Sequence, residues 1–206
     1  MKRIVCCAFI VALLLALGPG VARATVVTFD DLGSGPGAIP YGYDHVGLEW
    51  TNWYCDTGSF EPAYFGGVES SPNIAFNAYG TAATIMASSS PFYFDGAWFK
   101  GTYSDNLMLT VDDYSGSNLV YSKTVDLGSA EATTPMWVSF DWAGVTDLVF
   151  SGSGGTAPDA FGPGYPYQFT MDNFTFNQPV PEPISLIFFG TGLVGVCGYV
   201  ARRRKR

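Results

Sequence analysis

The stretch of sequence that decides the fold is residues 107–125, LMLTVDDYSGSNLVYSKTV. Apolar and polar residues alternate on both sides of a short run, 113–117, that contains Ser and Gly. Alternation with a period of two is typical of strands with one buried face, and two such strands around a Gly-containing run are typical of a β-hairpin. We therefore expect two antiparallel strands joined by a loop at 113–117.

The same pattern continues in both directions from this hairpin, from Thr25 to Pro179. Short runs rich in Val, Phe, Tyr and Thr are separated by Gly, Pro, Ser and Asn, and no convincing amphipathic helix interrupts them. The other expected strands are Val26–Phe29, Gly47–Trp53, Asn73–Asn77, Ala83–Ala87, Phe92–Tyr103, Met136–Trp142, Val145–Ser151 and Gln168–Phe176. About ten strands at this spacing predict an all-β, two-sheet sandwich of the jelly-roll kind, with a β-barrel as the alternative.

The N-terminal residues have the three parts of a secretory signal. Lys2 and Arg3 precede an apolar run, 4–17, and Ala22 and Ala24 form a small-x-small site around Arg23. This arrangement predicts a signal helix that is cleaved after Ala24. A first transmembrane helix is the alternative, but the apolar run is too short for a bilayer of about 30 Å.

The C-terminal residues combine a proline motif, an apolar segment and a basic end. The motif is Pro181, Glu182 and Pro183, the apolar segment is 184–200, and the basic end includes Arg202, Arg203 and Arg204. Prolines on both sides of Glu182 hold the chain extended, where a processing enzyme can bind it. The apolar segment is long enough for a short transmembrane helix, and the basic residues predict that its C-terminal end stays in the cytoplasm.

These three parts, in this order, resemble the PEP-CTERM sorting signal of Gram-negative bacteria. The resemblance implies that an exosortase recognises the Pro-Glu-Pro motif and releases the protein from its anchor. It divides the chain into a signal peptide (1–24), a β-sandwich ectodomain (25–178) and a sorting and anchor segment (179–206). We expect an inner-membrane precursor with its ectodomain in the periplasm, and later a cell-surface or extracellular product. An ordinary tail anchor is the alternative.

The expected ectodomain is strongly acidic. It keeps two basic residues, Lys100 and Lys123, against seventeen Asp and Glu, which gives a net charge near −15. That sign excludes nucleic-acid binding and suits solubility outside the cell or cation binding. Cys55 is its single cysteine, so it is either a buried thiol or a partner in an intermolecular disulfide.

Motifs for catalysis are missing from the ectodomain. Its one histidine, His45, is not accompanied by a Gly-x-Ser-x-Gly nucleophile motif or by an HExxH zinc motif. We therefore expect a protein that is not an enzyme. A hydrolase that acts on glycans with two paired carboxylates remains the alternative, because the sequence does not show which carboxylates meet.

Polar residues lie at the first and last expected strands. Asp30 and Asp31 close the first, while Asp172 and Asn173 interrupt the last, and the apolar positions change phase there. The change predicts a β-bulge, and the two strands lie side by side in many jelly rolls. Carboxylate, amide and carbonyl oxygens are the ligands that Ca²⁺ prefers, so we expect a structural calcium here. Alternatively, these side chains only form hydrogen bonds to turns and backbone.

Aromatic residues suggest a second site, at the end of the strand 47–53. Trp53 and Tyr54 lie between Asn52 and Asp56, and exposed aromatic rings beside amide and carboxylate groups are suited to carbohydrate binding. Core packing is the alternative. The expected function is thus a non-enzymatic surface or matrix protein associated with exopolysaccharide, with the hydrolase as the second candidate.

The ectodomain also carries weak motifs in a fixed order. They include Phe29-Asp30-Asp31-Leu32, Asn73-x-Ala75-Phe76-Asn77 and Met171-Asp172-Asn173-Phe174. In this order they resemble a family of secreted proteins of bacteria and fungi. The family has no established activity, so the resemblance concerns fold and export more than function.

Overall fold

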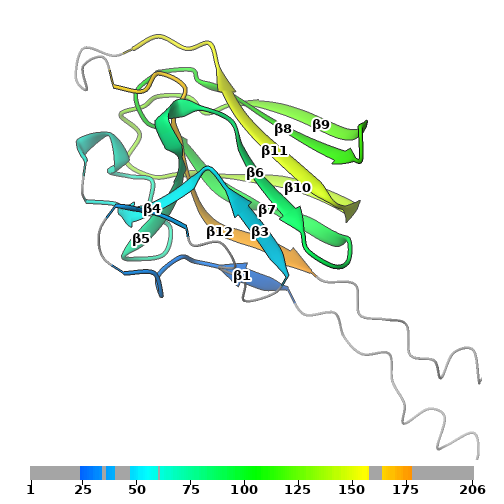
Figure 1. The fold of residues 1–206 in the computed structure, drawn as a ribbon. Coiled ribbons are helices and arrows are strands. Elements are labelled where there is room, and N and C mark those ends of the chain that lie inside the picture. Colours follow the sequence, from blue (N-terminus) through cyan, green and yellow to red (C-terminus); the bar gives the residue numbers. More distant parts are fainter. Residues whose placement is uncertain (1–23, 34–35, 40–46, 60, 158–163, 178–206) are drawn as a thin grey trace, which may run out of the picture. The chain divides into compact units, whose positions relative to one another are not determined.

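The computed structural model describes residues 24–33, 36–39, 47–59, 61–157 and 164–177 of the 206 residues (Figure 1). They belong to one compact unit, Arg23–Pro179. The predicted signal helix with Ala22, the sorting motif 181–183, the arginines 202–204 and His45 lie outside the described residues, so these predictions are not tested by the fold.

Twelve strands and two short 3₁₀ helices occupy the described part of the chain. They are β1 (Thr25–Val27), β2 (Gly37–Ala38), β3 (Leu48–Thr51), β4 (Trp53–Thr57), η1 (Pro62–Tyr64), β5 (Asn73–Asn77), η2 (Ala78–Gly80), β6 (Ala83–Ala87), β7 (Phe92–Gly101), β8 (Met108–Ser115), β9 (Asn118–Asp126), β10 (Met136–Val145), β11 (Asp147–Ser153) and β12 (Phe169–Asn177). The predicted strands at 73–77 and 83–87 have the observed bounds, and most others differ by a few residues at their ends.

The strands form two layers that face each other (Figure 1). The first sheet has the order β10-β7-β12-β5-β4-β2, with β1 also paired to β12, and the second has the order β3-β6-β11-β8-β9. Among strands β5 to β12, the order is β5-β12-β7-β10 in the first sheet and β6-β11-β8-β9 in the second. This is the strand order of a jelly roll. The predicted fold class is confirmed.

The hairpin at 107–125 forms as predicted, with a shorter loop. Strands β8 and β9 pair from Met108–Asp126 to Ser115–Asn118, so only Gly116 and Ser117 lie between them. Gly116 has φ +63°, a left-handed conformation that glycine adopts without strain. The predicted loop at 113–117 is longer than the observed one because β8 continues to Ser115.

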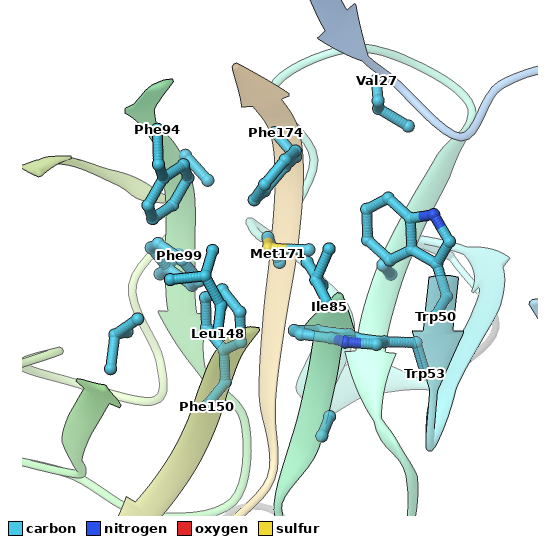
Figure 2. Packing of buried hydrophobic residues seen from close by; sticks show 14 of the residues in the cluster. Val27, Trp50, Trp53, Ile85, Phe94, Phe99, Leu148, Phe150, Met171 and Phe174 are labelled. Atoms are coloured by element: carbon cyan, nitrogen blue, oxygen red, sulfur yellow. The ribbon is translucent and has the colours of Figure 1, made fainter. Parts of the chain in front are cut away.

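The expected single strand Gly47–Trp53 is wrong, because it breaks at Asn52. Asn52 has φ +60°, and its Nδ2 donates to Thr81 Oγ1 at 2.7 Å and to the Ala82 carbonyl at 2.8 Å. The chain turns there from β3 in the second sheet to β4 in the first. As a result Trp50 and Trp53 both enter the core, with ring centroids 6.3 Å apart (Figure 2).

The space between the sheets is filled mainly by aromatic side chains. Phe94 is stacked between Phe140 and Phe174, with centroid distances of 4.6 and 4.8 Å. Figure 2 shows that Phe150 and Leu148 of β11 meet Phe94 and Phe99 of β7 across this layer. Each fully buried Phe or Leu side chain stabilises the folded state by about 1.5–3 kcal/mol.

The predicted bulge in the last strand is confirmed. The pairing of β12 with β7 changes register between Asp172 and Thr175, and Asn173 has φ +50°. Before the bulge, β12 pairs with β5, and after it with β1, so the first and last strands lie side by side as expected. Because of the extra residue, Met171 and Phe174 both face the core.

Candidate functional site

The outer face of the first sheet has a covered half and an open half. The loop between β4 and β5 covers one half, where Tyr64, Ile74 and Phe76 form a small second core. Outward-facing Thr170 and Asp172 of β12 are buried beneath it. The other half, formed by β7, β10 and the end of β12, carries half-buried or exposed side chains. This asymmetry decides which outward residues can meet a ligand.

Lys100 joins the loops that cover this face. Its side chain is buried, and its Nζ donates to the carbonyls of Ala63 at 3.0 Å, Gly101 at 3.1 Å and Ala130 at 2.6 Å. Ala63 belongs to the β4–β5 loop and Ala130 to the β9–β10 loop. Burial lowers the pKa of Lys100 from 10.5 to about 8, so the ammonium keeps its charge at neutral pH. Its role is structural.

Asp172 anchors the β4–β5 loop. Its Oδ2 accepts hydrogen bonds from the backbone N–H groups of Glu69 at 2.8 Å and Ser70 at 2.7 Å, and its Oδ1 accepts the N–H of Asn173 at 2.7 Å. The Ser70 hydroxyl also donates to Asn173 Oδ1 at 2.9 Å. Burial raises the pKa of Asp172 to about 6 in spite of these bonds.

Asp30 binds the chain at the same, C-terminal end of this loop, where the N–H of Asn73, the first residue of β5, donates to Asp30 Oδ1 at 3.0 Å. Asp31 is exposed in the adjacent turn. Hydrogen bonds to turns and backbone are what we expected for Asp30 and Asp172 as the alternative to calcium binding. Within the residues that the structure describes, no three His, Cys, Asp or Glu side chains are grouped to hold a metal ion. The calcium hypothesis stays a prediction.

The predicted sugar platform around Trp53 is wrong in its composition. Trp53 and Asp56 are each 1% exposed, and Asp56 Oδ1 accepts the Thr57 N–H at 2.7 Å. Asn52 stabilises the β3–β4 turn. Trp53 is buried because the strand breaks at Asn52, and this break directs the Trp53 side chain into the core. Of the four predicted residues, Tyr54 alone belongs to an exposed aromatic surface.

That surface, here called the tyrosine surface, consists of Tyr54, Tyr79, Tyr165 and Tyr167. Tyr79 is 61% exposed, and its ring centroid lies 6.0 Å from Tyr54 and 5.6 Å from Tyr165. A hydrogen bond to Tyr79 is the main cause of a raised pKa of Tyr54. Tyr165 and Tyr167 are nearly half exposed. The loop before β12 thus brings its tyrosines against η2.

A second aromatic group lies on the open half of the first sheet. Trp98 of β7 and Trp137 of β10 are direct register partners, with ring centroids 5.8 Å apart. Trp137 is 39% exposed. The same face carries Tyr93 and Asp95 of β7, Ser139 and Asp141 of β10, and Asn177 of β12. We call this group the tryptophan surface.

Sequence reasoning missed these residues, although the strand pattern contained a signal. Val138, Phe140 and Trp142 alternate into the core, which places Trp137 on the opposite face. In β7 the core phase changes at Gly96, so Trp98 also points outward. A glycine inside a strand often marks such an irregularity. No comparable signal indicated Tyr79, whose position depends on the turn at η2.

Cys55 is a buried thiol, as the first alternative held. It is 3% exposed and has no disulfide partner among the described residues. Burial raises the pKa of Cys55 to about 12, and the nearby carboxylates of Asp56 and Asp30 add to this effect. Such a thiol is unreactive at neutral pH.

Several solved structures are similar in fold to this chain. A DUF4465 family protein from Bacteroides caccae is 11% identical, with 76% of this chain and 99% of that one covered and a TM-score of 0.50. A second, from Bacteroides ovatus, is 14% identical, with 78% and 96% covered and a TM-score of 0.44. TmCBM61, solved in complex with β-1,4-galactotriose, is 13% identical, with 77% and 89% covered and a TM-score of 0.32. These similarities concern the fold alone.

The C-terminal segment identifies the sorting route. Residues 179–205 match the PEP-CTERM protein-sorting motif, which confirms the resemblance drawn from Pro181-Glu182-Pro183 and the basic end. The motif marks a protein that is exported and sorted through the membrane. Among curated proteins, no sequence matches this chain. In the described part of the chain, no helix is long and apolar enough to cross a bilayer, and the predicted span 184–200 lies outside that part.

Proposed function

We propose that this chain is a non-enzymatic protein that is exported, processed by an exosortase and retained at the cell surface or in the extracellular matrix. There its ectodomain associates with exopolysaccharide through the tyrosine surface. The sorting motif at 179–205 supports the first part. The observation that carries the second part is the exposed Tyr79 ring, which contacts the rings of Tyr54 and Tyr165.

Exposed tyrosines at this density suit a sugar ligand. An aromatic face covers the C–H groups of a pyranose ring, while the hydroxyl group exchanges hydrogen bonds with sugar hydroxyls. Contiguous exposed apolar side chains commonly mark an interaction site. Because the ectodomain carries a net charge near −15, acidic polymers are repelled, and the expected ligand of this surface is a neutral polysaccharide.

Substitution of Tyr79 tests the binding part. Tyr79→Asn removes the ring and suits the left-handed backbone at φ +55°. We expect the free energy of binding to the host's exopolysaccharide to weaken by about 1–3 kcal/mol, taking base–aromatic stacking as a guide to sugar stacking. Leu119→Ala, at an exposed position of β9 on the second sheet, is the matched control. Equal binding by wild type and Tyr79→Asn would remove the tyrosine surface from the proposal.

Processing is tested in the native host. The mature protein should begin at Thr25 and end near Pro181-Glu182-Pro183, because this tripeptide lies at the start of the matched sorting motif. Glu182→Ala should accumulate as a membrane-bound form. Intact mass of secreted protein that still carries residues 202–206 would contradict exosortase processing.

A glycan-active hydrolase is the second candidate, and one observation favours it. Asp95 and Asp141 lie on the same outer face beside two tryptophans, and Asp141 helps to raise the pKa of Asp95. Unequal protonation of two neighbouring carboxylates is what acid–base hydrolysis uses. New reducing ends after incubation with exopolysaccharide, abolished by Asp95→Asn, would favour this candidate.

A further inference from the structure

Gly96 has no side chain, and this leaves room for Trp137 of the tryptophan surface to lie against the sheet. A Cβ at Gly96 would lie 2.6 Å from Trp137 Cζ2 and 2.4 Å from the Val138 carbonyl oxygen. The indole of Trp137 therefore rests directly against the β7 backbone. Its neighbour Trp98 stands beside it at an interplanar angle of 63°. Together they form a supported aromatic platform open to solvent.

Two carboxylates lie on the same face: Asp95, three residues before Trp98 on β7, and Asp141, four residues after Trp137 on β10. Asp141 accepts a hydrogen bond from the Ser139 hydroxyl, and it is hydrogen-bonded to the Tyr93 hydroxyl. Asp95 accepts the Asn177 amide at 2.8 Å. Burial and the charge of Asp141 raise the pKa of Asp95, so the two carboxylates interact electrostatically. Their positions are set by neighbouring side chains rather than by solvent alone.

Neither carboxylate is neutralised by a basic side chain in the part of the chain that the structure describes. The Lys123 ammonium donates instead to the Ser139 carbonyl at 2.6 Å and lies 5.4 Å from the centroid of Phe140. No ion pair joins it to Asp95 or Asp141 among the described residues. The surface is therefore an aromatic platform beside uncompensated negative charge.

We propose that the tryptophan surface is a second glycan-binding site, selective for sugars that carry protonated amines. A pyranose ring lies on the Trp137 indole with Trp98 beside it, and the ammonium groups of the glycan are bound by Asp95 and Asp141. This site is separate from the tyrosine surface, so the inference does not depend on the proposed function of that surface.

The chemistry of the site favours this occupant over the alternatives. Indole is the aromatic group that attracts cations most strongly, and carboxylates supply hydrogen-bond acceptors for an ammonium group. An acidic polymer would meet like charge at Asp95 and Asp141. A neutral glycan would use the aromatic platform but leave both carboxylates without a cationic partner. An amine-bearing glycan can contact the aromatic rings with its sugar ring and the two carboxylates with its ammonium groups.

The test compares oligomers of glucosamine with their N-acetylated counterparts, which have the same ring and no positive charge. We expect the purified protein to bind the amine-bearing oligomer about tenfold or more tightly, as charged hydrogen bonds imply. Added salt should reduce this preference because it screens the charges. Trp137→Ala should lower the affinity of the amine-bearing oligomer about tenfold.

The substitution Asp141→Asn tests the contribution of the Asp141 charge to binding. Asparagine tolerates the φ of +54° at this position and keeps a hydrogen-bonding oxygen, so the fold is preserved while the charge is lost. It should abolish the preference for the amine-bearing oligomer. Asp112→Asn is the matched control, because it removes one charge from β8 in the second sheet. Tyr79→Asn should leave this binding unchanged, which separates the outcome from that of the tyrosine surface.

Three results would overturn the inference. The first is equal affinity for the amine-bearing and N-acetylated oligomers, which would leave the carboxylates without a role. The second is equally tight binding of polylysine that also depends on Trp137 and Asp141, which would replace the glycan with a cationic peptide. The third is the release of new reducing ends that requires Asp95 or Asp141, which would make the surface a hydrolytic site.

Discussion

Replacing Lys100 by methionine removes the ammonium group that joins two loops over the outer face of the first sheet. The carbonyls of Ala63, Gly101 and Ala130 would lose the donor that now lies 2.6–3.1 Å away. Methionine has a similar length and fills the same buried space without a donor. The substitution therefore tests whether these three contacts hold the loops.

Two effects of opposite sign determine the size of the change. Three buried acceptors lose their partner at about 1–3 kcal/mol each. Against this, the pKa of Lys100 falls from 10.5 to about 8 on folding, and at about 1.4 kcal/mol per pH unit this penalty of roughly 3 kcal/mol disappears with the charge. We expect a net loss of about 3 kcal/mol in the free energy of unfolding. For a domain of this size that corresponds to a melting temperature about 6–12 °C lower.

Thermal unfolding at pH 7, followed by circular dichroism or calorimetry, measures this loss. Lys123→Met is the matched control, because Lys123 is exposed and makes one hydrogen bond, and its effect should stay below about 1 kcal/mol. Above pH 8 the unfolded state binds more protons at Lys100 than the native state, so the wild type should gain stability up to about pH 10 relative to Lys100→Met. A Lys100→Met protein that melts within 1–2 °C of the Lys123→Met control would refute the structural role.

Asp172 gives the remaining predictions. Its native pKa of about 6 lies above the ordinary value of 3.8, so the native state binds the proton more tightly, and this contribution to stability should be lost as the pH rises from about 4 to 6. Asp172→Asn should remove that slope in urea unfolding measured across this range, and an unchanged slope would contradict the assignment. The structural calcium predicted at Asp30, Asp31, Asp172 and Asn173 requires a higher melting temperature in calcium than in EGTA, and equal values would contradict it. A fall of several degrees in EGTA would establish this calcium site.

Local sequence patterns were sufficient to predict the class of fold and the sorting motif. The alternation in residues 107–125 predicted the β8–β9 hairpin, because a strand with one buried face needs that period whatever its partners are. The phase change between Met171 and Phe174 predicted the bulge for the same reason. The sorting motif at 179–205 is equally local, since a processing enzyme reads consecutive residues.

The tertiary structure alone decided which aromatic residues are exposed. Trp53 ends the strand predicted at 47–53, where the sequence allows either a sugar-binding surface or core packing, and the left-handed turn at Asn52 directs it into the core. That turn is stabilised by Thr81 and Ala82, about thirty residues away, so the local pattern does not contain it. The pairing of Trp98 with Trp137 and the meeting of Tyr79 with Tyr165 depend in the same way on sheet order and loop placement. These are contacts between distant segments, which form because the two sheets must bury their apolar faces against each other.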